Sequence, residues 1–109
     1  MAHLLQTISK RTTFILIRNK GNTSRGKAFN VQFLEDKKLN NLIYVGFTAT
    51  KKIGTAVKRN KAKRIMRELA RKVIVKYGKI NSYYVLIAKS PIFETSFHSQ
   101  EIELKELIS

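Results

Sequence analysis

The stretch KKIGTAVKRNKAKRIMRELAR, residues 51–71, decides the fold. At about 100° per residue, the part from residue 58 onward predicts a helix with two opposite faces. One face gathers apolar side chains that are expected in the core: Ala62, Ile65, Met66, Leu69, Val73 and Tyr77. The other face gathers polar and basic side chains: Asn60, Lys63, Arg64, Arg67 and Arg71. The pattern therefore predicts a long amphipathic helix, which ends at Gly78.

The polar face of this helix carries charge of one sign. Solvated helices usually mix their signs through i,i+4 pairs, yet here only Glu68, at the edge of the face, is acidic. Ahead of the helix, Lys51, Lys52 and Gly54 form a tight turn, and the amides and dipole at a helix N-terminus favour a phosphate. A solvated face is the ordinary explanation of a charge run. The single sign and the turn favour the backbone of folded RNA instead.

Composition supports this interpretation. The chain has 109 residues, which predicts one domain over residues 1–109. Its formal charge of +15 makes a nucleic acid or an anionic membrane the expected partner. No apolar run approaches the roughly 18–20 residues of a membrane span, and the start lacks the layout of a secretion signal. We therefore expect a cytoplasmic protein that binds RNA and neither a membrane nor a small-molecule substrate.

Hydrophobic patterns predict the other elements. Further helices are expected at residues 7–19 and 93–108, and strands at residues 29–33, 42–49 and 83–88. The connections are expected to be a mobile basic loop at residues 22–27 and a polar hairpin connection at residues 35–41. Residues 42–49 are almost wholly apolar and are expected in the middle of the sheet. The order helix, two or three strands, helix, strand, helix predicts an α/β (α+β) two-layer sandwich with a small mixed sheet.

The order of residues in the basic stretch resembles the protein subunit of bacterial ribonuclease P. That family has a Ser-Lys-Lys-Val/Ile-Gly turn followed by an Arg-Asn-Arg-x-x-Lys/Arg-Arg helix. The matching residues are Thr50, Lys51, Lys52, Ile53, Gly54, Ala56, Val57, Arg59, Asn60, Lys61, Lys63, Arg64 and Arg67. Thr50 replaces the usual serine and keeps a hydroxyl. Lys61 replaces the usual arginine and lacks the planar fork that holds a phosphate with two bonds.

The resemblance covers the chain from about residue 8 to residue 108 and implies a fold, partners and a site. The fold would contain a left-handed β-α-β crossover, against the general rule. The partners would be the ribonuclease P RNA subunit and precursor tRNA. The surface for the RNA subunit would consist of Lys51, Lys52, Lys58, Arg59, Asn60, Lys61, Lys63, Arg64 and Arg67.

The resemblance also implies a cleft for the single-stranded 5′ leader of precursor tRNA. Phe14 matches the phenylalanine of the first helix in the family, and Phe29 matches the start of a Phe-Val-Leu strand. Arg18 stands where many members have a second phenylalanine, and Gln32 stands where some have tyrosine. This cleft is therefore expected to rely more on charge and hydrogen bonds. An ordinary core role for Phe14 and Phe29 is the alternative.

The sequence predicts no catalytic side chain and no metal site. His3 and His98 are the only histidines, cysteine is absent, and the seven acids have no spacing that would hold two metal ions. The resemblance implies that the RNA subunit performs the phosphodiester hydrolysis with Mg²⁺, so the protein would be an accessory subunit that assists removal of the leader. It would bind no cofactor itself.

Other classes of protein share part of this pattern. A structural RNA-binding protein of the ribosomal type would have the same size and charge but no role in tRNA processing. A protein-only nuclease or a DNA-binding protein is a further alternative, although a helix of Lys and Arg suits a backbone better than base edges. The ordered match through Arg67 disfavours both.

Overall fold

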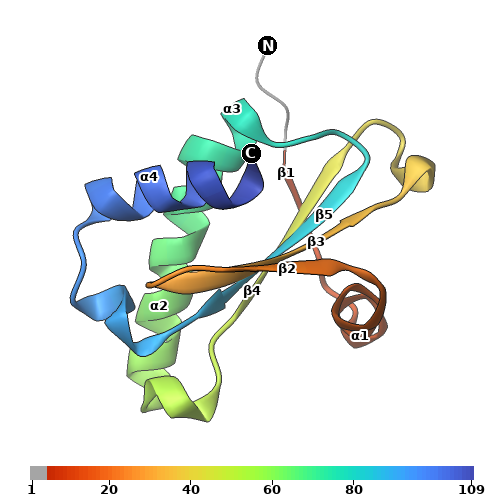
Figure 1. Cartoon of the computed structure of the whole chain (residues 1–109). Helices are drawn as coiled ribbons and strands as arrows, with labels where there is room; N and C mark the ends of the chain where they lie inside the picture. The colour runs from red at the N-terminus through yellow and green to blue at the C-terminus, as the bar shows by residue number, and fades with distance from the viewer. Residues whose placement is uncertain (1–4) are drawn as a thin grey trace.

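Helices lie on both faces of a five-stranded mixed sheet in the computed structural model, which describes residues 5–109 (Figure 1). The strands are β1 (Leu5–Thr7), β2 (Asn22–Arg25), β3 (Phe29–Glu35), β4 (Ile43–Thr48) and β5 (Ser82–Ala88). The helices are α1 (Arg11–Lys20), α2 (Ala56–Leu69), α3 (Val75–Tyr77) and α4 (Phe97–Ile108). Short 3-10 turns cover Lys37–Leu39, Lys51–Ile53 and Ser90–Phe93. The predicted class, a mixed α/β domain with a small mixed sheet packed against helices, is confirmed.

The strand order is β1-β4-β5-β3-β2, which corrects two predictions. β5 is the central strand, whereas residues 42–49 were expected in the middle. Because β5 lies between β3 and β4, residues 35–41 do not connect a hairpin. Apolar content shows that a strand is buried on both faces but not which strands lie beside it. The parallel pair β4 and β5, joined through α2, forms a β-α-β unit; its handedness stays an implication of the resemblance.

The two edge strands were missed because they are short and polar. Residues 22–27 were expected to be a mobile loop, but Asn22–Arg25 pairs antiparallel with β3. Residues 5–7 pair in parallel with β4, and α1 begins only at Arg11 instead of residue 7. An edge strand is held by backbone hydrogen bonds on one side and tolerates polar side chains. Hydrophobic alternation therefore gives little signal for it.

The last helix begins later than predicted. Residues 90–93 form a separate 3-10 turn with Pro91 near its start. Helix α4 then starts after Ser96, whose hydroxyl oxygen accepts a hydrogen bond from the Ser99 N–H at 3.1 Å. A serine in this position satisfies one of the free amides of the first helical turn. No helix within residues 5–109 has the length and apolar content to cross a membrane.

Alternating side chains of the strands form a core on each face of the sheet. Toward α2 and α4, the large core contains Phe29, Val31, Ile43, Val45, Met66, Leu69, Tyr84, Leu86 and Leu104. Toward α1, a smaller cluster contains Ile8, Ile17 and Val85, with Phe14 and Leu34 packed against it. The sheet is thus closed by two helices on one face and only partly covered by α1 on the other (Figure 1).

A π-helical turn at Ala70–Ile74 interrupts the long helix and changes which residues face the core. It holds more residues per turn than an α-helix, so later side chains point in other directions than the 3.6-residue period predicts. Ile74 is completely buried, whereas Tyr77, which was predicted to be in the core, is 45% exposed. The prediction for Tyr77 was therefore wrong, and its ring lies on the surface.

Candidate RNA-binding surface

The turn before α2 is built to present its lysines. Ile53 is buried and anchors the 3-10 turn, while Lys51 and Lys52 on the same turn are exposed. Gly54 follows with a φ of 134°, a conformation that residues with a Cβ rarely adopt. Thr55 caps α2, because its Oγ1 accepts a hydrogen bond from the Lys58 N–H at 3.3 Å. The turn thus holds the backbone of two exposed lysines beside a helix N-terminus, whose partial positive charge adds to theirs.

Helix α2 buries one side and exposes the other as predicted. Ala62, Met66 and Leu69 are buried against the sheet. The exposed side of the helix presents Asn60, Arg64, Arg67 and Arg71. Arg71 forms an ion pair with Glu68 at 2.8 Å, so its charge is partly compensated. We call the row Asn60, Lys63, Arg64 and Arg67 the α2 stripe.

Three predicted RNA-binding residues of the helix lie outside this row. Lys58 is exposed in the first turn of the helix. Arg59 is half-buried, and its Nη1 donates a hydrogen bond to the Gly54 carbonyl at 3.0 Å, so it holds the turn in place. Lys61 points to the flank that faces the C-terminal segment, with its Nζ 5.8 Å from the centre of the Phe93 ring. The structure therefore divides the predicted residues of the helix into the α2 stripe, the exposed Lys58, a positioning residue and a flank residue.

The α2 stripe continues into a cleft on the α1 face of the sheet. Arg67 lies over the ring of Phe47, 5.7 Å from its centre, and Lys63 is half-buried at the edge of the cleft. Phe47 belongs to β4 and lines the same cleft. Cationic side chains thus extend from the outer side of α2 to the rim of the hollow without an interruption by an acid.

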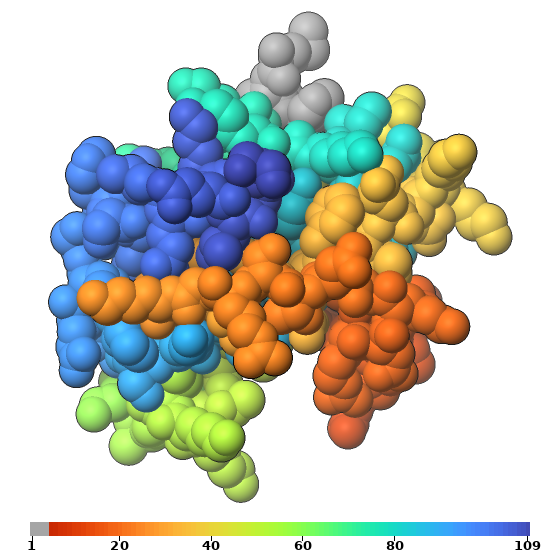
Figure 2. Space-filling view, in the orientation of Figure 1, coloured from red at the N-terminus to blue at the C-terminus, as the bar shows by residue number. Residues whose placement is uncertain are grey.

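The cleft is a hollow of about 580 Å³ between α1 and the sheet. In Figure 2, α1 and the beginning of α2 stand apart at the lower edge of the molecule with this hollow between them. Its lining residues are Ser9, Arg11, Phe14, Ile15, Arg18, Gln32, Phe47, Thr48, Ala49, Thr50, Lys63, Val85 and Ile87. Three of these are basic and none is acidic. The floor is apolar along β5, and β4 adds an aromatic ring and a hydroxyl through Phe47 and Thr48, a combination that suits a strand of nucleotides.

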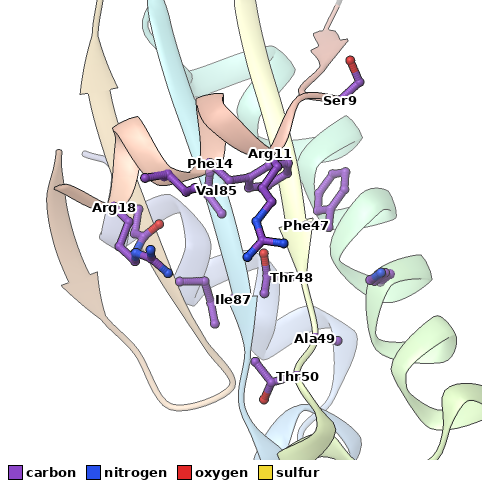
Figure 3. A pocket seen from close by; sticks show the side chains of 13 residues that line it. Ser9, Arg11, Phe14, Arg18, Phe47, Thr48, Ala49, Thr50, Val85 and Ile87 are labelled. Atoms are coloured by element: carbon purple, nitrogen blue, oxygen red, sulfur yellow. The ribbon is translucent and has the colours of Figure 1, made fainter. Parts of the chain in front are cut away.

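Two of the three predicted cleft residues lie in the hollow. Phe14 and Arg18 project from α1 over the strands, and Figure 3 shows them with Arg11 from the same helix. Gln32, which like Arg18 stands where some family members have an aromatic residue, lines the floor of the cleft. The ring of Phe14 lies over Gly46: a Cβ built on that glycine would be 2.5 Å from Phe14 Cε1.

The third residue, Phe29, is a correction. It has no exposed surface and belongs to the large core on the α2 and α4 face of the sheet. Phe14 packs with the smaller cluster on the opposite face. Since strand side chains alternate between faces, Phe29 cannot line the cleft together with Phe14. The alternative of an ordinary core role holds for Phe29.

Arg11 and Thr48 are cleft residues that the sequence analysis missed. Arg11 lies one turn before Phe14 and two turns before Arg18, so helical spacing alone could have placed it on the same side. Thr48 lies at the end of β4 and faces the cleft (Figure 3). There was less reason in the sequence to place Thr48 in the cleft, because a threonine at the end of a strand is common.

The described residues contain no cluster of catalytic or metal-binding side chains. Within residues 5–109, no three His, Asp or Glu side chains come close enough to hold a metal ion. His98 is exposed at the start of α4, and His3 lies outside the described residues. Among the described residues, the surface offers cations, backbone amides and aromatic rings, which are the kinds of group that contact nucleic acid in proteins.

Comparisons with known proteins agree with this geometry. Residues 4–109 match the family model described as Ribonuclease P. A ribonuclease P protein component of Caulobacter vibrioides is 42% identical over 84 residues, which cover 77% of this chain and 56% of the relative. That of Clostridium botulinum (strain Eklund 17B) is 28% identical over 96% of this chain and 87% of its own.

A solved structure shares the fold over nearly its whole length. The ribonuclease P protein from Thermotoga maritima superimposes with a TM-score of 0.80 at 27% identity, covering 94% of each chain. This chain spans little more than half the length of the Caulobacter relatives that it matches. The family model covers all of the described residues, and the turn, the α2 stripe and the cleft lie within it. The chain belongs to the ribonuclease P protein component family.

Proposed function

We propose that this chain is the protein subunit of a ribonuclease P ribonucleoprotein, which removes the 5′ leader of precursor tRNA. The turn and the α2 stripe bind the RNA subunit through its phosphates. The cleft holds the single-stranded leader. The observation that carries this proposal is the continuity between the two surfaces, since Lys63 of the stripe lines the cleft and Arg67 of the stripe lies over Phe47, which lines it too. One protein could thereby hold the enzyme RNA and its substrate side by side.

The chemistry is assigned to the RNA subunit. Mg²⁺ held by that RNA would supply the activated water for the hydrolysis of the phosphodiester. The protein neutralises crowded phosphates with the α2 stripe and the lysines of the turn. It thereby lowers the Mg²⁺ concentration that the folded RNA requires. Holding the leader in the cleft favours precursor over mature tRNA.

The decisive experiment is 5′ cleavage of precursor tRNA at low Mg²⁺ with a bacterial ribonuclease P RNA, with the protein, and with both. Cleavage only with both supports an RNA-enzyme subunit. Charge reversal of Lys63 and Arg67 should then remove the gain, while the same change at Lys37 and Lys38, which lie in the exposed turn between β3 and β4, should not. Cleavage by the protein alone, after nuclease contamination is excluded, would contradict the proposal.

Salt dependence separates backbone binding from other modes. If the protein neutralises roughly 6–10 phosphates, its affinity for the RNA subunit should fall by about 10³ to 10⁵ between low and moderate salt, on a scale taken from duplex DNA. Each stripe cation removed should reduce the slope by about one phosphate contact. A protein that adds nothing to a suitable RNA, but binds ribosomal RNA with the same slope, would fit the structural RNA-binding class instead.

The leader contact has its own test. Phe14→Ala should weaken binding of precursor tRNA by about 1–3 kcal/mol, the usual value of one stacked base, and leave binding of mature tRNA unchanged. Arg18→Glu should act in the same direction through charge. Equal losses for precursor and mature tRNA would mean that the cleft does not hold the leader.

A further inference from the structure

Lysines lie over three aromatic rings along the outer junction of the long helix and the C-terminal segment. Lys61 Nζ is 5.8 Å from the centre of the Phe93 ring, and Lys72 Nζ is 5.4 Å from that of Phe97. The Tyr77 ring has Lys105 Nζ at 4.5 Å and Lys76 Nζ at 5.4 Å from its centre. We call these residues the seam: Lys61, Lys72, Lys76, Tyr77, Phe93, Phe97 and Lys105.

The seam exposes apolar surface that the core does not use. Tyr77 is 45% exposed, Phe93 36% and the neighbouring Ile102 48%. Two shallow hollows of about 230 and 160 Å³ follow the junction, one beside Tyr77 and one beside Phe93. Phe97 lines the second hollow and lies under Lys72, which lines the first. The contact between Lys72 and Phe97 therefore links the linings of the two hollows.

The π-helical turn is the structural cause of this surface. It brings Ile74 into the core and leaves the Tyr77 ring outside. Irregular turns of this kind occur frequently at functional sites. The charges of Lys105 and Lys76 lower the pKa of the Tyr77 hydroxyl, so the ring lies in a positive field.

The seam is separate from the surfaces assigned above. Lys61 and Lys72 lie on the flank of the helix that faces α4, whereas Lys63 lines the cleft on the opposite flank. No described residue lines both the cleft and a seam hollow. Helix α4 lies beside the C-terminal part of the long helix (Figure 1), while α1 lies on the other face of the sheet.

We propose that the seam is a second site for single-stranded RNA, in which unpaired bases stack on Tyr77 and Phe93 while the lysines hold the phosphates. Exposed rings interleaved with cations are the arrangement that binds unpaired nucleotides. Of the described residues that line the two hollows, Glu101 is the one carboxylate, and it shares its hollow with Lys72, Lys76 and Lys105. An acidic peptide would satisfy these charges but would leave the rings unused. The proposal goes beyond the leader and the α2 stripe, and it does not depend on either.

Single-cysteine reporters test the seam, because the chain has no cysteine of its own. Ile102→Cys reports the seam, Ser9→Cys reports the cleft, and Lys38→Cys reports a remote exposed turn. A single-stranded RNA of about twelve nucleotides, within the usual site size, is added before alkylation with a maleimide. The expected result is slower alkylation at position 102 with no change at position 38. An RNA duplex of the same length should protect position 102 less.

Stacking is tested on the Ile102→Cys background. Tyr77→Leu should weaken the RNA affinity reported at position 102 by about tenfold, and Tyr77→Phe should keep it. Both changes are at an exposed position, and thermal unfolding checks that the variants fold. The proposal is overturned if position 102 reacts at the same rate while position 9 is protected, or if polyglutamate protects it equally. Protection at position 102 without protection at position 9 would support the seam and count against the leader cleft.

Discussion

The two faces of the sheet use the same kinds of residues for different purposes. On the face of α2 and α4, strand side chains and helices close a large core, and Phe29 has no exposed surface. On the face of α1, only a small cluster is buried, and Phe14 borders an open hollow with three cationic side chains. The closed face holds most of the buried core, while the open face keeps the hollow that is proposed to hold the leader. The role of a phenylalanine here depends on the side of the sheet that it occupies.

The largest difference in the free energy of unfolding is expected between two single variants, Phe29→Ala and Phe14→Ala. Phe29→Ala removes a fully buried ring and should lower the free energy of unfolding by about 3–5 kcal/mol. Phe14→Ala should cost clearly less, because its ring is partly exposed beside the hollow. Urea unfolding of both variants measures the difference. Equal losses would contradict the division into a closed and an open face.

Sequence patterns predicted the closed face better than the open one. The period of the long helix identified Met66 and Leu69 as core, and strand alternation identified Val31 and Phe33 as one side of a strand. Burial repeats along the chain and leaves a periodic signal. The cleft collects one to four residues from each of α1, three strands and α2, and a pattern within one element does not show that these elements meet. The resemblance to the family supplied Phe14 and Arg18, and it misplaced Phe29.

The pairing of the polar edge strand and the irregular turn of the long helix were the features hardest to predict from the sequence. The polar strand at residues 22–25 is held by β3 and has no alternation of its own. The π-helical turn at residues 70–74 contains no residue type that would predict it. Because of this turn, Tyr77 lies on the surface and not in the predicted core. Such features follow from tertiary packing, which overrides local propensity.

A smaller effect should come from Gly46, where the open face touches the Phe14 ring. A Cβ at this position would be 2.5 Å from Phe14 Cε1 and 2.7 Å from its Cζ, so the ring would have to move into the hollow. Gly46→Ala should lower the free energy of unfolding by about 1–3 kcal/mol. In the Phe14→Ala background the same change should cost less than about 1 kcal/mol, because the clash is gone. Identical costs in both backgrounds, measured by thermal unfolding, would show that the ring does not limit this position.

Two arginines of the basic stretch should show the same contrast between a residue that stabilises the fold and an exposed residue, with smaller changes in the free energy of unfolding. Arg59→Ala removes the hydrogen bond to the Gly54 carbonyl and should lower the free energy of unfolding by about 1 kcal/mol. Arg64→Ala changes an exposed side chain and should stay within about 0.5 kcal/mol. Both should weaken binding of the RNA subunit, but only Arg64→Ala should do so without a loss of stability. If Arg59→Ala were equally stable, its hydrogen bond would not hold the turn.

The smallest effect should come from Glu68, the one acid at the edge of the α2 stripe. Its ion pair with Arg71 is exposed, and such pairs contribute little, so Glu68→Gln should change the free energy of unfolding by less than about 0.5 kcal/mol. Removing the carboxylate should strengthen RNA binding a few-fold at low salt, and the gain should fade as salt screens the charges. Glu35→Gln is the matched control, because Glu35 forms a similarly exposed ion pair with Lys79 at 2.9 Å, at the end of β3. Filter binding at two salt concentrations measures both variants. An equal gain for Glu35→Gln would mean that net charge, and not the α2 stripe, governs the affinity.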